Sequence, residues 1–335
     1  MPYVPYDELG ERPNVIVDGA ANAHTLISLS HWPGSRTPGS LKDDLSAQIV
    51  FHYLDRPEFW VQADAVSNNH FDEDGLVGIY CLLNPSSAQA DRALLIDIAA
   101  AGDFGTYRFR DAARTAFVLS RFADPNLSPL DPEIFRQPYP KLAARLYQEL
   151  LPRLPEIMNH IDSFRTYWAS EDTMLEESEA MIRDGRIQIE DISALDLAIV
   201  TLPESLHGRT VHRFTQNRRA ACHPMALHNV LDAFRVLFVQ GRTYELQYRY
   251  ESWVQYISRR PLPRIDLRPL AQELAEMESG NGRWAFDGVE ALTPRLSLVD
   301  ADESHIPPQE FIARVKQCLA QAMAHGAGTP AGGDQ

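Results

Sequence analysis

Cysteine is scarce in this chain, and long hydrophobic runs are absent. The three cysteines, none in a C-x-x-C spacing, are Cys81, Cys222 and Cys318. We therefore expect reduced thiols and no zinc site built from cysteine. No apolar run is long enough to span a bilayer. Residues 1–6 (MPYVPY) have neither a basic start nor an apolar core, so we expect no signal peptide, no membrane partner and a cytoplasmic location.

Positive charge is also in deficit, because the formal net charge is −15 at pH 7. Binding to duplex DNA without sequence preference depends on neutralising phosphates, so we expect no duplex partner. The composition, 44% hydrophobic and 23% charged, is typical of a globular protein rather than a fibre or a disordered chain. With 335 residues, the chain is expected to form two domains, because one hydrophobic core usually stops growing before that size.

Two short apolar stretches near the start end in residues that can bind a cation. Residues 14–19 (NVIVDG) and 25–30 (TLISLS) predict strands that lead to Asp18 and His31. In open α/β sheets ligands bind at the carboxyl ends of the strands, so the two side chains are expected to converge there. Two alternatives stay open: Asp18 as a turn residue, and His31 as an imidazole packed on Trp32.

The polar turn at 67–76 (SNNHFDEDGL) lies between two apolar runs and predicts a strand, a tight turn and a helix. Asp72 and Asp74, with His70 two positions before Asp72, place three ligands on one turn, close enough to share a cation. Gly75 allows a sharp turn before the helix. The alternative is a helix N-terminus that Asp72 caps and where Asp74 meets the macrodipole.

Further along, residues 93–98 (ALLIDI) predict a buried strand. Asp97, inside that run, is interpreted as a hydrogen-bonded structural acid. Asp103, in the small-residue turn that follows, is the better candidate ligand. Alternating strands and helices predict an α/β fold with a mostly parallel sheet covered by helices on both faces, plus a second, smaller α/β domain and a helical linker.

The second half of the chain is expected to form a separate domain. A proline-rich stretch from Asp124 and then helical patterning from Lys141 to Arg183 predict a boundary and a linker. The expected divisions are a first domain at 1–125, a linker at 126–185, a second domain at 186–325 and a disordered tail at 326–335. In the second domain we expect strands at 186–192, 195–202, 236–240, 243–250 and 253–257, and helices at 226–234, 267–278 and 311–323. No internal repeat is found.

Arginine is concentrated in the second half. From His207 to Arg268 eleven arginines stand against four acidic residues, a local excess of seven. An acidic first half that could hold metal is thus followed by an arginine-rich half that could hold an anion. The alternative for these arginines is a solvated surface or salt bridges.

Several of these stretches resemble motifs of the DHH phosphoesterase superfamily, whose members hydrolyse phosphodiester or phosphoanhydride bonds with a two-manganese centre. In the first half the similar stretches are 71–75 (FDEDG, its D-x-D-G turn), 30–34 (SHWPG, its D-H-H motif), 44–50 (DLSAQIV, its next helix) and 101–109 (AGDFGTYRF, its fourth motif). In the second half, 254–260, 265–267 and 280–283 are similar to the DHH-associated domain, whose strand-arginine segment and G-G-G-H loop hold the substrate. The resemblance implies that 1–125 is a DHH-like metal-binding domain and 186–325 a DHH-associated substrate domain.

The chain also departs from that family. The stretches that contain Asp18 and His31 precede the D-x-D-G turn, so the order resembles a permuted, distant relative. D-H-H is replaced by Ser-His-Trp at 30–32, and Trp284 stands where the loop motif has histidine. These changes are compatible with a one-metal enzyme, a shifted two-metal site or a fold that has lost catalysis.

From these observations the expected function is a metal-dependent phosphoesterase that hydrolyses a small, anionic, nucleotide-like substrate in the cleft between two domains. One or two Mn²⁺ or Mg²⁺ ions would be held by Asp18, His31, His70, Asp72, Asp74 and Asp103, with Asp72, Asp74 and His31 catalytic. The expected substrate contacts are Arg218, Arg219, His223, Arg260, Gly280, Gly282 and Arg283. The same features are compatible with a short single-stranded nucleic acid as partner and with a homodimer.

Two other functions compete with this one. The first is a non-catalytic nucleotide-binding sensor on a degenerate DHH-type fold. The second is a phosphatase of the haloacid-dehalogenase type, because residues 72–76 (DEDGL) resemble the D-x-D-G-T turn of that family, in which the first aspartate is the nucleophile. Its chemistry needs a lysine and a later acidic pair, and the only lysines are Lys42, Lys141 and Lys316, none at a strand end. This possibility ranks third.

Overall fold

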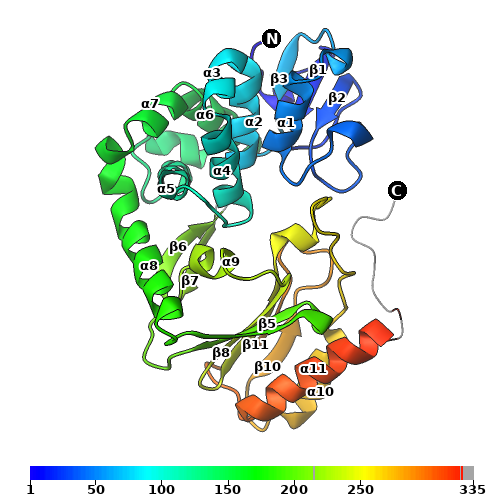
Figure 1. Ribbon diagram of the computed structural model, residues 1–335, viewed down its shortest axis with the longest axis vertical. Coiled ribbons are helices and arrows are strands. Elements are labelled where there is room, and N and C mark those ends of the chain that lie inside the picture. Colours follow the sequence, from blue (N-terminus) through cyan, green and yellow to red (C-terminus); the bar gives the residue numbers. More distant parts are fainter. Residues whose placement is uncertain (214–215, 325, 327–335) are drawn as a thin grey trace. The chain divides into compact units, whose positions relative to one another are not determined.

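The computed structural model describes residues 1–213, 216–324 and 326, with the side chains of 212–218 left out of the description. The chain divides into two compact units (Figure 1). Unit 1 contains Met1–Glu176 and Arg209–Met225, and unit 2 contains Glu177–Gly208 and Ala226–Gln335. Apart from residue 326, the expected disordered tail lies outside the described residues.

Unit 1 contains a small parallel sheet. Its strands, in the order β2-β1-β3, are β1 (Asn14–Val17), β2 (Thr25–Leu29) and β3 (Ala65–Ser67). All four residues of β1, the central strand, are buried, as expected for a parallel strand covered on both faces. The strands predicted at 14–19 and 25–30 are confirmed. Their carboxyl ends, together with that of β3, meet at one edge of the sheet.

Eight helices account for most of the remaining regular structure in the described part of unit 1 (Figure 1). They are α1 (Ser46–Leu54), α2 (Glu73–Leu83), α3 (Pro85–Ala90), α4 (Arg92–Asp103), α5 (Arg110–Ala123), α6 (Tyr139–Leu150), α7 (Leu154–Asn159) and α8 (Arg165–Arg183), the last of which continues into unit 2. Helix α2 packs on α1 and α4 and approaches β1 closely. A Cβ on Gly78 would lie only 2.6 Å from Cγ1 of Val17, so this approach requires glycine.

The strand predicted at 93–98 is wrong, because these residues belong to helix α4. A short apolar run cannot by itself distinguish a buried strand from a buried helix. Here alanine and leucine, both strong helix formers, continue the run to 12 helical residues, and α4 packs between α2 and α5. Asp103 therefore lies at the end of a helix rather than in a turn after a strand.

A segment of the second half returns to unit 1. It contains the antiparallel hairpin of β6 (Arg209–Arg213) and β7 (Gln216–Ala220), and it ends at the start of α9 (Pro224–His228). Strand β6 packs on α5. Unit 1 is therefore built from two separate stretches of the chain.

Unit 2 has a six-stranded sheet in the order β10-β11-β9-β8-β5-β4. Its strands are β4 (Gln188–Ile192), β5 (Leu197–Leu202), β8 (Arg235–Gln240), β9 (Thr243–Tyr248), β10 (Arg283–Phe286) and β11 (Arg295–Val299). Only β5 and β8 pair in parallel. The α/β class is confirmed, but the mostly parallel arrangement holds only for the three-stranded sheet of unit 1. The predicted hairpin around Gly241 is present as β8 and β9.

Helices α10 (Arg268–Met277) and α11 (Pro308–Ala324) pack with this sheet around one apolar core (Figure 1). The core includes Leu237 and Leu246 of the sheet, Leu274 of α10 and Phe311 of α11. The strand predicted at 253–257 is wrong, because no strand forms there after the short 3₁₀ turn Tyr250–Ser252.

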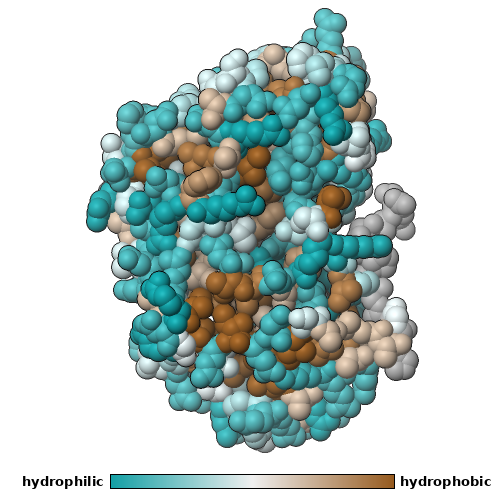
Figure 2. Space-filling model, in the orientation of Figure 1, coloured by the Kyte–Doolittle hydropathy of each residue, from teal (hydrophilic) through white to brown (hydrophobic). Residues whose placement is uncertain are grey.

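On the face shown in Figure 2, hydrophilic residues are interspersed with smaller hydrophobic groups. Exposed large apolar side chains such as Trp60 and Val230 are far apart in the sequence. In the described part of the chain, no helix combines the length and the apolar character needed to cross a membrane.

Candidate metal centre

All six predicted ligands come together in unit 1. Asp18 follows β1, and His31 follows β2. His70 and Asp72 lie between β3 and α2, Asp74 is in the first turn of α2, and Asp103 ends α4. The parallel sheet brings the first four side chains to one edge, as expected for adjacent parallel strands.

Asp18 lies between the two imidazoles. Its Oδ1 is 3.3 Å from Nε2 of His31 and accepts a hydrogen bond of 2.7 Å from Oγ of Ser46. Its Oδ2 is 3.3 Å from Nε2 of His70. Asp18 has a left-handed backbone, with φ of 48°, which is uncommon outside glycine and is often found at functional sites. One carboxylate therefore faces two separate groups of ligands.

His31 has its ring fixed in the form that a metal needs. Its Nδ1 lies 2.6 Å from the carbonyl oxygen of Asp44. A carbonyl can only accept, so Nδ1 carries a proton, and the neutral ring has its lone pair on Nε2. Nε2 lies 3.4 Å from Oδ2 of Asp103 and 3.9 Å from Oδ2 of Asp74, in addition to its contact with Asp18.

Asp72 and Asp74 both cap helices, as the alternative interpretation predicts for Asp72. Asp72 Oδ1 accepts from the Gly75 amide at 2.9 Å at the start of α2. The two oxygens of Asp74 accept from the amides of Ser46 and Ala47, both at 2.7 Å, at the start of α1. Capping uses one lone pair on each bonded oxygen, so it does not exclude ligation. Oδ2 of Asp72 lies 2.7 Å from Nε2 of His70, facing the ligand group.

The side chains form two clusters of possible metal ligands that share Asp18. The His70 cluster contains Asp18, His70 and Asp72, and the His31 cluster contains Asp18, His31 and Asp74. Within each cluster the ligand atoms lie within 4.8 Å of one another. Asp103 adds a further carboxylate beside His31. Asp18 is the residue that the two clusters have in common.

Burial makes the acids of this site hard to ionise together. Burial and the charge of Asp18 raise the pKa of Asp74 to about 7. Burial and the charges of Asp72 and Asp74 raise the pKa of Asp103 well above its usual range, and burial also raises the pKa of Asp72. The cause is an excess of buried negative charge. A divalent cation would supply the charge that is missing.

The pKa values of the two imidazoles are raised as well, which for a histidine favours the charged form. Burial opposes a charge on His31, but the contact with Asp18 outweighs it and raises the pKa of His31 to about 9. Burial also opposes a charge on His70, and Asp72 and Asp18 raise its pKa well above the usual value. Burial alone would raise the pKa of Asp18, but the hydrogen bonds and charges of His31 and His70 outweigh it and hold this pKa below the usual range. A cation that binds at Nε2 would therefore compete with a proton.

The donor set fits a hard divalent cation. It offers four carboxylates and two imidazoles and no thiolate, a combination that suits Mn²⁺ or Mg²⁺ better than a soft metal. Five of the six residues are buried, and the His70 side chain, 19% exposed, is the most accessible. The rings of Trp32 and His70 lie 4.9 Å apart at this accessible side.

Asp97 has a different role, as expected from its interpretation as a structural acid. Its carboxylate accepts from the backbone amides of Arg108 and Phe109, just before α5. The acid therefore holds the segment that leads into α5 and is not part of either cluster.

The predicted substrate residues are placed in several parts of the fold. Arg219 and His223 belong to unit 1, as does Arg218, whose side chain lies outside the described residues. Arg260, Gly280, Gly282 and Arg283 belong to unit 2. The Arg260 side chain is exposed, and Arg283 is 67% exposed and lies 3.8 Å from Asp300.

The two glycines have a packing reason that the sequence did not show. A Cβ on Gly280 would lie 2.6 Å from the ring of His305, and a Cβ on Gly282 would lie 2.7 Å from Leu298. A larger residue at either position would require the neighbouring side chain to shift.

Several arginines of the second half are structural. The buried guanidinium groups of Arg235, Arg249 and Arg264 donate to backbone carbonyl oxygens within unit 2, and Arg264 alone binds three of them in the loop 289–292. The local excess of positive charge is thus partly buried inside the fold. Arg260 remains at the surface, where it could meet an anion.

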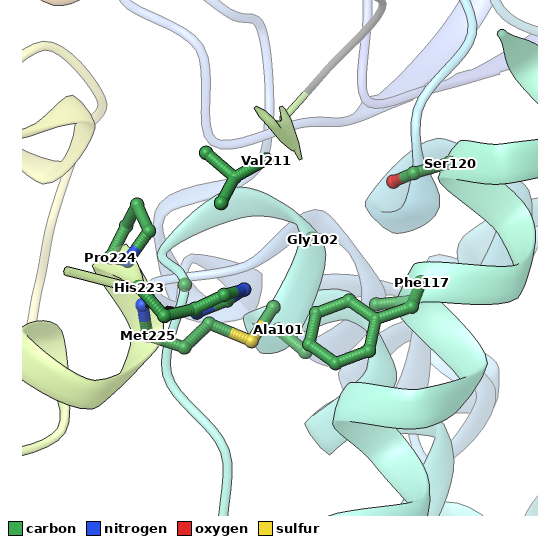
Figure 3. Close-up of a pocket in the computed structure, with 10 residues that line it drawn as sticks. Ala101, Gly102, Phe117, Ser120, Val211, His223, Pro224 and Met225 are labelled. Carbon is green, nitrogen blue, oxygen red and sulfur yellow. Dashed lines mark hydrogen bonds between the residues drawn. The ribbon is translucent and has the colours of Figure 1, made fainter. Parts of the chain in front are cut away.

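His223 lines a small pocket in unit 1 (Figure 3). The pocket has a volume of about 20 Å³, which is room for one water molecule. Nδ1 of His223 accepts from the amide of Met225 at 3.2 Å, and Nε2 lies 3.5 Å from Glu171. The ring also packs edge-on against Phe117. These contacts are those of a buried structural histidine, and the pocket is too small for a phosphorylated substrate.

Residues that support the ligands were not found from the sequence. Ser46, Asn68 and Tyr147 contact Asp18, the backbone of His70 and Asn68 respectively. Ser46 had one signal, its place at the start of the helix similar to that of the DHH family. Tyr147 had none, because it lies 79 positions from Asn68.

Comparisons with known proteins add a family but no activity. A family model described as "Family of unknown function (DUF6687)" matches residues 1–328. No curated protein matches the chain. Among solved structures, the pGpG-specific phosphodiesterase PggH from Vibrio cholrae is similar over 96% of this chain and 89% of its own, with 11% identity and a TM-score of 0.33.

Proposed function

This chain belongs to the DUF6687 family of unknown function, and we propose that it is a metal-dependent phosphoesterase with two divalent ions in unit 1. The observation that carries the proposal is the position of Asp18. One carboxylate, with an imidazole on each side, belongs to both ligand clusters. A purely structural arrangement gives no reason to bury four carboxylates together, since buried like charges are costly.

The residues would divide the work as follows. Bound ions would neutralise the phosphate, lower the pKa of the attacking water and stabilise developing charge. The carbonyl of Asp44 holds Nδ1–H of His31, so Nε2 stays directed at the site. Ser46 orients Asp18, and the start of α1 orients Asp74. Each ligand is thereby fixed by a second residue, which is the usual arrangement around protein-bound metals.

The substrate class is part of the proposal. A small phosphorylated molecule, nucleotide-like if the DHH resemblance holds, would enter beside His70, the most accessible ligand. We propose that Mn²⁺ is the better ion and Mg²⁺ the second choice, because the donor set is rich in oxygen and includes two imidazoles.

The test is hydrolysis by the metal-stripped, full-length protein with added Mn²⁺, Mg²⁺, Ca²⁺ or Zn²⁺. Bis(p-nitrophenyl) phosphate serves as a general phosphodiester, and a short dinucleotide serves as the nucleotide-like substrate. We expect turnover that needs Mn²⁺ or Mg²⁺ and that Asp72→Asn and Asp74→Asn abolish. Asp64→Asn, which changes an exposed acid just before β3, is the matched control and should retain full activity. Binding of a nucleotide without turnover of any substrate would support the sensor instead.

The observation that favours a sensor is the limited access to the clusters. Five of the six ligands are almost fully buried, and only His70 is partly exposed.

A haloacid-dehalogenase mechanism has less support. Around Asp72 the charged groups that shift its pKa are His70 and Asp18 rather than a lysine. Lys141 is paired instead with surface acids near the start of the chain.

A further inference from the structure

The loop that carries His70 is held by a helix from a distant part of the chain. Helix α6 lies in the stretch that the sequence assigns to a linker, and it presents two tyrosines to this loop. Oη of Tyr147 accepts from Nδ2 of Asn68 at 3.0 Å. Oη of Tyr139 accepts from the amide of Phe71 at 3.2 Å. The two hydroxyl groups thus bind the loop before and after His70.

Asn68 passes this support on to the metal ligand. While its Nδ2 donates to Tyr147, its Oδ1 accepts from the amide of His70 at 3.1 Å. The link from α6 to the backbone of His70 therefore needs only two hydrogen bonds. Asn68 is 2% exposed, so water is a poor substitute for either partner.

The hydroxyl group of Tyr147 is itself fixed in place. The residue is fully buried, and its ring lies 5.0 Å from that of Tyr3 and 5.2 Å from that of Phe71. A Cβ on Gly75 would lie 2.4 Å from Nδ2 of Asn68 and 2.5 Å from Oη of Tyr147. Gly75 is therefore needed for a close approach, not only for a turn. The hydrogen-bonded pair packs directly on the first turn of α2, just after Asp72.

The His31 cluster has separate supports. His31 is bound by the carbonyl of Asp44, and Asp74 by the amides of Ser46 and Ala47 at the start of α1. These three hydrogen bonds come from the loop before α1 and from its first turn, not from Asn68 or α6. The support from α6 therefore reaches the His70 cluster through Asn68, and Asp18 links that cluster to the His31 cluster.

We propose that Tyr147, acting through Asn68, is a positioning residue that sets His70 for one of the two metal ions. The inference rests on the proposed function, because it assumes two ions in unit 1. It assigns to α6, expected from the sequence to be a linker, a part in building the metal centre. Removal of the hydroxyl group should loosen His70 while the His31 cluster keeps its geometry.

The test is isothermal titration of Mn²⁺ into metal-stripped full-length protein. Wild type should bind two ions. Tyr147→Phe keeps the ring and removes the hydroxyl, and it should weaken one of the two binding steps by roughly 10-fold or more, the usual effect of losing a residue behind a metal ligand. The other step should keep an affinity close to that of wild type, since its supports are intact.

Tyr53→Phe is the matched control. Tyr53 is also a buried tyrosine of unit 1, and its hydroxyl accepts one backbone hydrogen bond, from Val61, away from both clusters. This variant should bind both ions as wild type does. A general loss of stability would affect the two tyrosine variants alike, whereas lost positioning affects only Tyr147→Phe.

A second variant separates positioning from packing. Asn68→Ala should weaken the same binding step, and Tyr147→Phe should add little when Asn68 is already alanine, because both act through one chain of bonds. This variant also serves if Tyr147→Phe does not fold. Two normal binding steps in Tyr147→Phe, or effects of the two variants that simply add, would overturn the inference. A wild type that binds no Mn²⁺ would overturn the proposed function as well.

Discussion

Substitution of Asp18 should remove both metal ions, because its carboxylate belongs to both clusters. At a Mn²⁺ concentration 100-fold above the dissociation constant, each bound ion stabilises the native state by about 2.7 kcal/mol. Two ions therefore contribute about 5 kcal/mol. Unit 1 has about 190 residues, a size at which 1 kcal/mol shifts the melting temperature by about 2–4 °C. Wild type should thus melt about 10–20 °C higher with Mn²⁺ than without it.

The variants divide this shift in a defined way. Asp18→Asn should show almost none of it, and Asp74→Asn, which leaves the His70 cluster intact, should retain about half. Asp64→Asn should melt as wild type does in both conditions. Differential scanning calorimetry of wild type and the three variants, each metal-stripped and with Mn²⁺, gives the four shifts in melting temperature. If Asp18→Asn keeps half of the wild-type shift or more, the two clusters do not share a ligand and the reasoning is wrong.

The remaining predictions concern charge and substrate. Asp103→Asn should stabilise the metal-free protein, because burial and like charges raise the pKa of this acid and make its ionised form costly at pH 7. In calorimetry the same change should weaken Mn²⁺ binding. The pKa of Asp74 is raised to about 7 and that of His31 to about 9, so the metal-free native state binds more protons than the unfolded chain at neutral pH. Its melting temperature should therefore fall between pH 6 and pH 9. The increase in melting temperature that Mn²⁺ causes should grow over the same range, because fewer protons compete with the metal. Arg260→Lys and Arg283→Lys should raise KM several-fold and leave Mn²⁺ binding unchanged, since lysine lacks the bidentate geometry for phosphate; an unchanged KM in both would show that unit 2 does not hold the phosphate.

The first strands and the convergence of the residues that follow them could be predicted because the signals are local. A short apolar strand followed by Asp18 or His31 places the side chain at a sheet edge, and parallel pairing does the rest. The D-x-D-G turn predicted both a helix start and a ligand pair, and in the structure Asp72 caps its helix while facing His70. The two interpretations are compatible, because one carboxylate has lone pairs for both.

Other features could not be predicted because they depend on distant contacts. Residues 93–98 alone do not distinguish a strand from a helix; the helix-forming residues that extend the run and the packing of α4 between α2 and α5 decide it. The arginine excess suggested an anion site, yet Arg264 donates hydrogen bonds to three backbone carbonyl groups. These carbonyl groups need a protein donor only once the chain has folded around them. The link between Tyr147 and Asn68 joins two segments with no shared pattern.

The most direct test of the central claim is a crystal structure of the protein grown with Mn²⁺, with anomalous diffraction data that locate manganese. The account predicts two anomalous peaks per chain in unit 1, about 3.5–4 Å apart, as in two-metal hydrolases. Asp18 should lie between them, with His70 and Asp72 on one ion and His31 and Asp74 on the other. A single peak, or two peaks that do not share Asp18, would contradict the account.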